Sequence, residues 1–437
     1  MSGRGLRLGL LVAALVGCLG YGIWERDPDA VRMALMPAAD PPSPTHVFII
    51  LDTVRQDRTS VCGFEQPTTP TLERLAARED AQLSCRAYTP GDWTLPSHAS
   101  FFTGVPALEH RAHGIGGAVM DEVPVSARPL DASFETMAET FTKRGYQTLS
   151  VSANPILSPE TGLTQGFDVA LWGTFAQSKR TQLLRRLRAG LIQLDPSRPL
   201  FVFVNITDTH GPLVRIPEGH PWLEHTRALN HRERDRAVAD PHLRAHLDAL
   251  YSYGVEQTDS TLAGSLELLS DAGWLDDTSR IVITSDHGEL LGEHGMVGHG
   301  SQVWEENNRV IFLAVGPDMP ELPETFNAME VHPILLEGAL RGFPVESSAF
   351  PMHANREGDP EDRIWLGEWI GTEKWTWNQG ETYRTELATD PKEQHPIAVE
   401  TDRFGAGPEQ ALKQFRAEGE QVDEGMIEML RAAGYID

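Results

Sequence analysis

The segment HVFIIL, residues His46–Leu51, is followed directly by Asp52. Its apolar residues are consecutive and do not alternate with polar ones, which predicts a strand buried on both faces of a sheet. Similar runs occur at Thr148–Ala153, Leu200–Ile206, Arg280–Thr284 and Val310–Val315. Helical patterns lie between the strands, at Pro70–Arg78, Ser133–Arg144 and Arg244–Ala272. We expect Ser133 to cap the second helix at its start and Gly145 at its end. The alternation predicts an α/β fold with a mainly parallel sheet covered by helices on both faces.

The pattern changes after about residue 342, where the expected strands become short and polar. These strands are Trp365–Trp369, Lys374–Trp377 and Tyr383–Leu387, and a helical stretch follows at Val422–Ala432. We therefore predict a catalytic domain over residues 45–341. Residues 342–437 are expected to form a smaller α+β subdomain with an antiparallel sheet and a closing helix.

The amino terminus has the pattern of an export signal. Arg4 and Arg7 precede an uncharged apolar run over residues 8–24, which is short for a membrane-spanning helix. Within this run, the sequence LVGC ending at Cys18 resembles a bacterial lipobox, in which the cysteine is acylated. A plain cleaved signal and an uncleaved anchor are the alternatives. Residues 1–24 are therefore expected to export the chain into a bacterial cell envelope, membrane-anchored or secreted, with residues 25–44 as a linker.

Charge and cysteine content exclude several classes of protein. Thirty-seven Lys and Arg residues against 63 Asp and Glu residues give a net charge of −26 over 437 residues. This leaves no basic excess to displace the counterions of nucleic acid, so we expect no nucleic-acid partner. Three cysteines are too few for a disulfide scaffold or a thiolate zinc module. Export would permit a disulfide between Cys62 and Cys85, and two separate buried thiols are equally compatible with the sequence.

Aspartate and histidine follow three of the expected strands. Asp52 follows the first strand, Asp208 and His210 follow Leu200–Ile206, and Asp286 and His287 follow Arg280–Thr284. In open α/β sheets ligands bind beyond the carboxyl ends of the strands. The sequence therefore predicts a site where these side chains meet.

A threonine at the start of an expected helix is the candidate nucleophile. Thr94 lies in WTLPSHASFFTG, residues 93–104, and is followed two residues later by Pro96, which fits the first turn of a helix. One interpretation makes Thr94 an N-cap. The other makes its hydroxyl a nucleophile at a helix N-terminus, where the dipole favours an oxyanion.

The residue types at the strand ends are those of metal ligands. The carboxylates of Asp52 and Asp286, the imidazole of His287 and the hydroxyl of Thr94 suit Zn²⁺ or a related divalent ion. A divalent ion lowers the pKa of a hydroxyl, which is otherwise a poor nucleophile at neutral pH.

As a set, these segments resemble the sulfatase family of the alkaline phosphatase superfamily. The matching segments are 47–57 (VFIILDTVRQD), 67–75 (PTTPTLERL), 93–104, 206–212 (ITDTHGP), 283–300 (ITSDHGELLGEHGMVGHG), 305–317 and 430–436 (LRAAGYI). They follow the family's order over nearly the whole chain beyond the linker. The resemblance implies an alkaline-phosphatase-like α/β/α sandwich that hydrolyses esters with a bound metal.

The resemblance also implies roles for individual residues. Asp52, Asp286 and His287 fall on metal-ligand positions, and Thr94 falls on the nucleophile position. His210 and His299 fall on positions that contact the transferred group or its leaving oxygen. Asp57 falls on an acidic position near the site. The alternative to a single ion is a second metal site to which Asp208, His210 and His299 contribute. Asp208 could instead cap the loop that follows its strand.

The departures from the family pattern concern the nucleophile. Sulfatases carry Cys or Ser, oxidised to formylglycine, in a Cys/Ser-x-Pro-x-Arg motif, whereas this chain has Thr94, and His98 replaces the Arg. Oxidation of threonine would give a ketone and not the aldehyde of formylglycine, so the hydrate of that aldehyde cannot serve as the nucleophile here. We therefore count His98 among the catalytic candidates. The Asp286–His287 pair replaces the usual Asp-Asn, which favours Zn²⁺, then Mn²⁺, over Ca²⁺.

Threonine combined with an Asp-His pair resembles the phosphotransfer branch, which includes phosphodiesterases and phosphoethanolamine transferases. We therefore expect a hydrolase of phosphate-type esters (phosphomonoesters, phosphodiesters or phosphonates) or of sulfate esters, with one or two divalent ions. The expected partner is a small-molecule, glycan or lipid ester. The alternatives are a sulfuric ester hydrolase proper, a transferase that moves a phospho-headgroup, and an inactive binding module.

Overall fold

The large domain is built on one eight-stranded sheet. The computed structural model describes residues 44–113, 119–120, 123–124, 127–173, 179–300, 302–350, 364–378, 380–405, 407 and 410. The strand order in the sheet is β12-β2-β11-β8-β1-β7-β5-β6. The strands are β1 (His46–Leu51), β2 (Ala81–Tyr88), β5 (Gln147–Ser152), β6 (Val169–Leu171), β7 (Leu200–Ile206), β8 (Arg280–Thr284), β11 (Arg309–Val315) and β12 (Phe326–Asn327). Five neighbours, from β8 to β6, are parallel, and β11 runs antiparallel to both β8 and β2.

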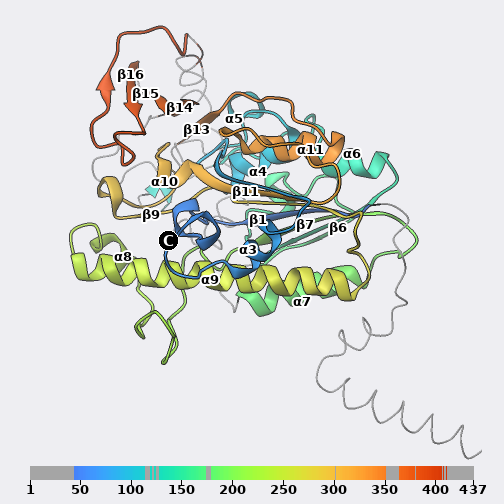
Figure 1. Ribbon diagram of the computed structural model, residues 1–437. Helices are drawn as coiled ribbons and strands as arrows, with labels where there is room; N and C mark the ends of the chain where they lie inside the picture. The colour runs from blue at the N-terminus through green and yellow to red at the C-terminus, as the bar shows by residue number, and fades with distance from the viewer. Residues whose placement is uncertain are drawn as a thin grey trace, which may run out of the picture.

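Strand β1 divides the hydrophobic core into two layers. Val47, Ile49 and Leu51 belong to the cluster beneath one face of the sheet, and Phe48 and Ile50 belong to the cluster on the other face. Helices α3 (Pro70–Ala76), α7 (Lys179–Leu191) and α9 (Pro241–Asp271) cover the first face, and α4 (Thr94–Thr103), α6 (Met137–Lys143) and α11 (Val331–Glu337) cover the second (Figure 1). This two-sided burial explains the uninterrupted apolar sequence, and the expected α/β/α sandwich is confirmed.

The start of helix α6 differs from the prediction that Ser133 is its N-cap. The helix begins after Thr136, whose hydroxyl accepts a hydrogen bond from the Glu139 amide while the Glu139 carboxylate accepts one from the Thr136 amide. This reciprocal capping box satisfies two amides at once, which a lone serine three residues earlier cannot do.

A second, five-stranded antiparallel sheet follows the large domain, as the short polar strands predicted. Its strands are β13 (Glu346–Ala349), β14 (Trp365–Ile370), β15 (Glu373–Asn378), β16 (Glu381–Glu386) and β17 (Ile397–Ala398). It joins the large domain through Tyr88, whose ring stacks on Trp369 with centroids 4.4 Å apart. Lys374 reaches across as well, because its ammonium group binds the Val303 carbonyl of the large domain. The Glu393 carboxylate, which pairs with Lys374 within the second subdomain, accepts a hydrogen bond from the Glu305 amide of the large domain. The expected helix at Val422–Ala432 lies outside the described residues, and the domain boundaries remain predictions.

Cys62 and Cys85 form a disulfide, which decides between the two states that the sequence left open. The bridge links the second short helix after β1, Ser60–Cys62, to strand β2. The export signal and Cys18 lie outside the described residues. Within the described part of the chain, no helix has both the length and the apolar character needed to cross a membrane.

We predict that the buried Lys374–Glu393 pair holds the second sheet against the large domain. Lys374 is 1% exposed and Glu393 is 4% exposed, so Lys374→Met leaves a carboxylate buried without its cation. Loss of one partner of such a pair should lower the free energy of unfolding by about 3–5 kcal/mol. Chemical denaturation followed by tryptophan fluorescence measures this loss. The double variant Lys374→Met/Glu393→Gln should recover most of it, and equal stability of wild type and the single variant would contradict the prediction.

Candidate active site

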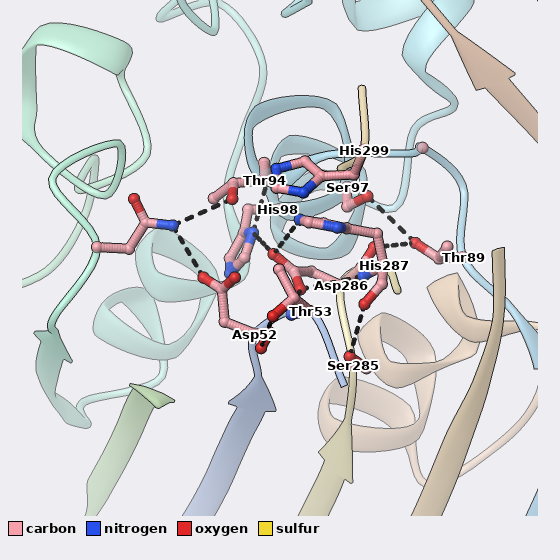
Figure 2. Close-up of polar contacts among 12 residues, drawn as sticks. Asp52, Thr53, Thr89, Thr94, Ser97, His98, Ser285, Asp286, His287 and His299 are labelled. Atoms are coloured by element: carbon pink, nitrogen blue, oxygen red, sulfur yellow. Dashed lines mark hydrogen bonds and ion pairs between the residues drawn. The ribbon is translucent and has the colours of Figure 1, made fainter. Parts of the chain in front are cut away.

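Two carboxylates and an imidazole meet at the carboxyl edge of the sheet. Asp52 follows β1, and Asp286 and His287 follow β8, which is the hydrogen-bonded neighbour of β1. One ligand atom from each of the three residues lies within 4.8 Å of the other two, and all three side chains are fully buried. Figure 2 shows them above the ends of the two strands, with Thr94 and His299 close by. The predicted convergence of strand-end residues is therefore present in the fold.

Hydrogen bonds hold one side of each carboxylate. Asp52 Oδ2 accepts bonds from Asn154 Nδ2 at 2.8 Å and from Asn205 Nδ2 at 3.1 Å. Asp286 Oδ1 accepts bonds from the backbone amides of Thr53 and His287, at 3.2 and 3.0 Å. Within the described residues, Asp52 Oδ1, Asp286 Oδ2 and His287 Nε2 have no hydrogen-bond partner. Each residue thus keeps one ligand atom available on a side chain whose orientation is fixed.

The pKa shifts in this cluster are those expected of carboxylates and an imidazole that lie together without a compensating cation. Burial, reinforced by the charge of Asp286, raises the pKa of Asp52 to about 7, and burial raises that of Asp286 to about 7 as well. Burial lowers the pKa of His287 to about 3, so its ring is neutral, and Nδ1 lies 2.9 Å from the Gly288 carbonyl. A neutral imidazole that donates through Nδ1 presents Nε2 as a ligand. Two carboxylates and this imidazole fit a divalent cation such as Zn²⁺ or Mn²⁺.

Thr94 is the first residue of helix α4, after Trp93 in the N-cap position. Its hydroxyl therefore lies at the positive end of the helix dipole, and the side chain is fully buried. Asn154 Nδ2 is 3.1 Å from Thr94 Oγ1 and also donates to Asp52 Oδ2. One amide group thus connects the threonine oxygen to the carboxylate cluster. Thr94 is not the N-cap itself, which removes the alternative interpretation of the local sequence.

His287 of the cluster is the first of three imidazoles that lie in a row with His299 and His210. The ring centroid of His299 lies 4.3 Å from that of His287 and 5.3 Å from that of His210. His299 Nδ1 pairs with Glu289 Oε2 at 2.7 Å, and Glu289 also pairs with Arg234 at 2.9 Å. Burial opposes the charged form of His299, but the Glu289 carboxylate outweighs it and raises the pKa of His299 above its ordinary value. His299 is therefore suited to donate a proton from its other nitrogen.

Three further predicted residues have identifiable contacts. His98 Nδ1 lies 2.8 Å from the Thr94 carbonyl and 3.7 Å from Asp286 Oδ2, and burial lowers the pKa of His98 to about 3. Asp57 forms a bidentate ion pair with the Arg55 guanidinium. Asp208 accepts a hydrogen bond from Thr261 on α9, and neither Asp208 nor His210 belongs to the described three-ligand cluster. A catalytic role for His98 and a second metal at Asp208 remain predictions.

Sequence reasoning missed Asn154, Asn205 and Glu289. Asn154 stands just after β5, so the strand-end rule that found Asp52 would have found it, had asparagine been counted with the ligand types. Asn205 lies within β7 and reads as part of a buried strand. Glu289 lies two residues after His287, where only the folded loop brings it to His299.

Comparisons with known proteins agree with this geometry. The sequence pattern of the sulfatase family matches residues 44–325. An ulvan-active sulfatase from Formosa agariphila is 23% identical over 314 residues, which cover 64% of this chain and 57% of that protein. The protein YhbX of Escherichia coli is 23% identical over 248 residues, which cover 56% of this chain and 37% of its own length. The chain thus spans about half the length of these curated relatives.

Solved structures show the same fold. A 2-O GAG sulfatase superposes with a TM-score of 0.62 at 14% identity, over 90% of this chain and 96% of that one. A phosphonate monoester hydrolase from Agrobacterium radiobacter superposes with a TM-score of 0.59 at 18% identity, over 86% and 96%. These folds and the cluster at the sheet edge define an alkaline-phosphatase-like α/β protein. Because the family pattern covers more than half of the sequence, the chain belongs to the sulfatase family.

We predict that Asn154 is essential for holding Thr94 against the cluster. Asn154→Ala removes the only described side chain that bridges Thr94 Oγ1 and Asp52, and should lower kcat on an aryl ester by about 10²–10³-fold, as loss of an active-site donor does. Asn205→Ala is the matched control, because Asn205 donates to Asp52 without contacting Thr94 in the described hydrogen bonds. Steady-state kinetics should give a clearly smaller loss for the control, and equal losses would contradict the assignment.

Proposed function

We propose that this protein hydrolyses phosphate-type or sulfate esters through Thr94, with a divalent cation held by Asp52, Asp286 and His287. The observation that carries the proposal is the single Asn154 amide that contacts both Thr94 Oγ1 and Asp52. It ties a hydroxyl at a helix N-terminus to a buried cluster of carboxylates and imidazole. A structural role alone would not require two fully buried aspartates in such proximity, since buried charges are costly unless they are compensated.

Residues of this chain account for the attack on the ester and for protonation of the leaving alcohol. Thr94 Oγ1, whose proton has passed to solvent, forms a bond to phosphorus or sulfur while the bond from that atom to the leaving alcohol breaks. The leaving oxygen takes a proton from an imidazole, for which His299 is the first candidate because Glu289 favours its charged form. Water then attacks the Thr94 ester, the same imidazole receives the water proton, and Thr94 is released. A bound divalent cation supplies positive charge that favours the Thr94 alkoxide and offsets charge on the transferred group.

The residue at the nucleophile position favours phosphate-type esters. A threonine cannot become the formylglycine of sulfatases, because oxidation of its secondary alcohol gives a ketone. Enzymes that transfer phosphoryl groups through a covalent intermediate instead commonly use an unmodified side chain, such as a hydroxyl, as the nucleophile. The similarity in fold to a phosphonate monoester hydrolase is compatible with this choice, whereas that to a 2-O GAG sulfatase keeps sulfate esters in the proposal. The ester is expected on a small molecule, a glycan or a lipid.

We predict that Thr94→Ala abolishes ester turnover. Removing the nucleophile should lower kcat by at least about 10³-fold. The assay compares p-nitrophenyl phosphate, bis-p-nitrophenyl phosphate, p-nitrophenyl phenylphosphonate and p-nitrophenyl sulfate on one metal-loaded preparation. The account expects the phosphorus esters to be turned over faster than the sulfate.

Thr94→Ser is the matched control, because it keeps the hydroxyl and loses only a methyl group. It should retain activity within about tenfold of wild type, a difference of about 1.4 kcal/mol in the barrier. Alanine activity within a few-fold of wild type would refute the nucleophile. Turnover that requires an added acceptor alcohol would instead identify a transferase.

We further propose that the chain is exported and anchored through an acylated Cys18. The lipobox-like LVGC and the preceding arginines support this proposal. The catalytic part should then fractionate with membranes of a bacterial host, and Cys18→Ser should release it or leave it with an uncleaved signal. Detergent phase separation of the two forms measures the difference. A Cys18→Ser form whose signal has been cleaved and that still partitions as wild type does would contradict the lipid anchor.

A further inference from the structure

Helix α8 (His231–Arg236) brings one side chain into contact with a residue beside His299. The helix lies in the segment between β7 and α9, residues 207–240. Arg234 Nη2 donates a hydrogen bond to Glu289 Oε1 at 2.9 Å, and Glu289 Oε2 lies 2.7 Å from His299 Nδ1. The two oxygens of one carboxylate therefore bind different partners, a guanidinium on one side and an imidazole on the other.

Both members of the Arg234–Glu289 ion pair are largely withdrawn from water. The Glu289 side chain is 4% exposed, and the Arg234 side chain is 19% exposed. Solvent screens a pair at such a position much less than it screens a surface pair. Because each oxygen of the Glu289 carboxylate has its own partner, rotation of the carboxylate would break both interactions. Arg234 thus fixes the orientation of Glu289, and with it the oxygen that meets His299 Nδ1.

The same guanidinium packs against the loop that carries His210. A Cβ atom placed on Gly211 would lie 2.3 Å from Arg234 Nη1, so any side chain at this position would displace the guanidinium. His210 Nδ1 lies 2.8 Å from the Gly211 carbonyl oxygen. Arg234 therefore touches both the segment that follows His210 and the carboxylate that binds His299. It connects the two loops that carry these imidazoles.

Helix α8 is itself anchored at both ends, which places Arg234 in a defined position. Asn230 and Glu233 form a reciprocal capping box at the start of the helix. Beyond its end, Ala237 is fully buried in the core cluster beneath the first face of the sheet, and Asp240 caps the start of α9. Because the backbone is already fixed, the Arg234 side chain loses less conformational entropy on forming its ion pair than it would on a loose loop.

We propose that Arg234 is a positioning residue for ester cleavage. It holds Glu289, and through Glu289 it holds the His299 ring in the orientation needed to protonate the leaving alcohol. This inference rests on the proposed function, in which His299 supplies that proton. Among the described hydrogen bonds and ion pairs, Arg234 has none with the three-residue metal cluster, so its effect on turnover is expected to pass through Glu289. The segment 207–240 would then complete the active site from outside the central sheet.

The first experiment varies the basicity of the leaving alcohol. Wild type and Arg234→Met, both as metal-loaded full chains, are assayed on the p-nitrophenyl and phenyl esters of phosphate, phenylphosphonate and sulfate, and the pair that wild type turns over is compared. The more basic oxygen of phenol depends more on proton donation than that of p-nitrophenol does. Arg234→Met should therefore lower kcat/KM by about tenfold on the p-nitrophenyl ester and by about 10²-fold or more on the phenyl ester. A loss of stability alone would lower both values alike.

A double variant tests whether Arg234 acts through Glu289. Glu289→Gln keeps the shape of the side chain and removes its charge. Arg234→Met/Glu289→Gln should lie within a few-fold of Glu289→Gln alone, because the losses of residues that act together are not additive.

Two further variants complete the set. Arg236→Met is the matched control, since Arg236 is exposed on the same helix, and it should leave turnover of both esters unchanged. Arg234→Lys keeps the positive charge on a shorter side chain and should show the same dependence on the leaving alcohol with a smaller loss. It takes the place of Arg234→Met should that variant not fold.

The outcomes separate this inference from the proposed function. Equal losses on the two esters, or losses that multiply in the double variant, would overturn the positioning role while turnover through Thr94 stands. A wild type that turns over none of the esters, or Thr94→Ala as active as wild type, would refute the proposed function and this inference with it. A larger loss on the phenyl ester that disappears in the Glu289→Gln background would support both.

Discussion

Two aspartate carboxylates, Asp52 and Asp286, lie side by side in a place that water does not reach. Each would prefer to be protonated there, because burial raises both pKa values and the charge of Asp286 adds to the rise for Asp52. The two carboxylates can stay ionised there only if a positive charge lies close to them. The His287 ring is neutral and cannot supply that charge. A divalent cation would satisfy all three side chains at once. Thr94, the proposed nucleophile, and His299, the proposed proton donor, lie close to the site where this cation would bind (Figure 2).

The fold supports this arrangement at every level. Adjacent parallel strands β1 and β8 end together, so residues 234 positions apart in the sequence become neighbours. Helix α4 delivers Thr94 with its N-terminus toward the cluster, and Asn154 joins the two. Glu289 binds Nδ1 of His299 and favours the charged form of its ring. The second sheet places the Trp365 ring 6.2 Å from that of Trp304, which follows the loop that carries His299.

Local sequence patterns predicted the buried strands, because burial leaves a signal in the sequence of the strand itself. The bounds of β1, β7 and β8 coincide with their apolar runs because burial on both faces leaves a continuous signal. The disulfide, the antiparallel β2 and the Lys374–Glu393 pair were not predictable in this way. Each depends on which distant segments pack together. Lys374 in particular shares its face of the strand with Thr376 and Asn378, in alternation with Trp375 and Trp377, like a solvent-facing residue. Glu289 acquires its role only from neighbours that the fold supplies, whereas the strand-end rule reaches Asn154 once asparagine is counted among the ligand types.

The most direct test of the central claim is the metal content of the purified protein, measured by elemental mass spectrometry beside turnover of an aryl phosphate. The account predicts about one tightly bound divalent ion per chain, coordinated by the three-residue cluster. Asp52→Asn and Asp286→Asn, which keep the side-chain shape and remove the charge, should lose both the ion and activity. Full activity in a chain that has been exhaustively stripped of metal would contradict it.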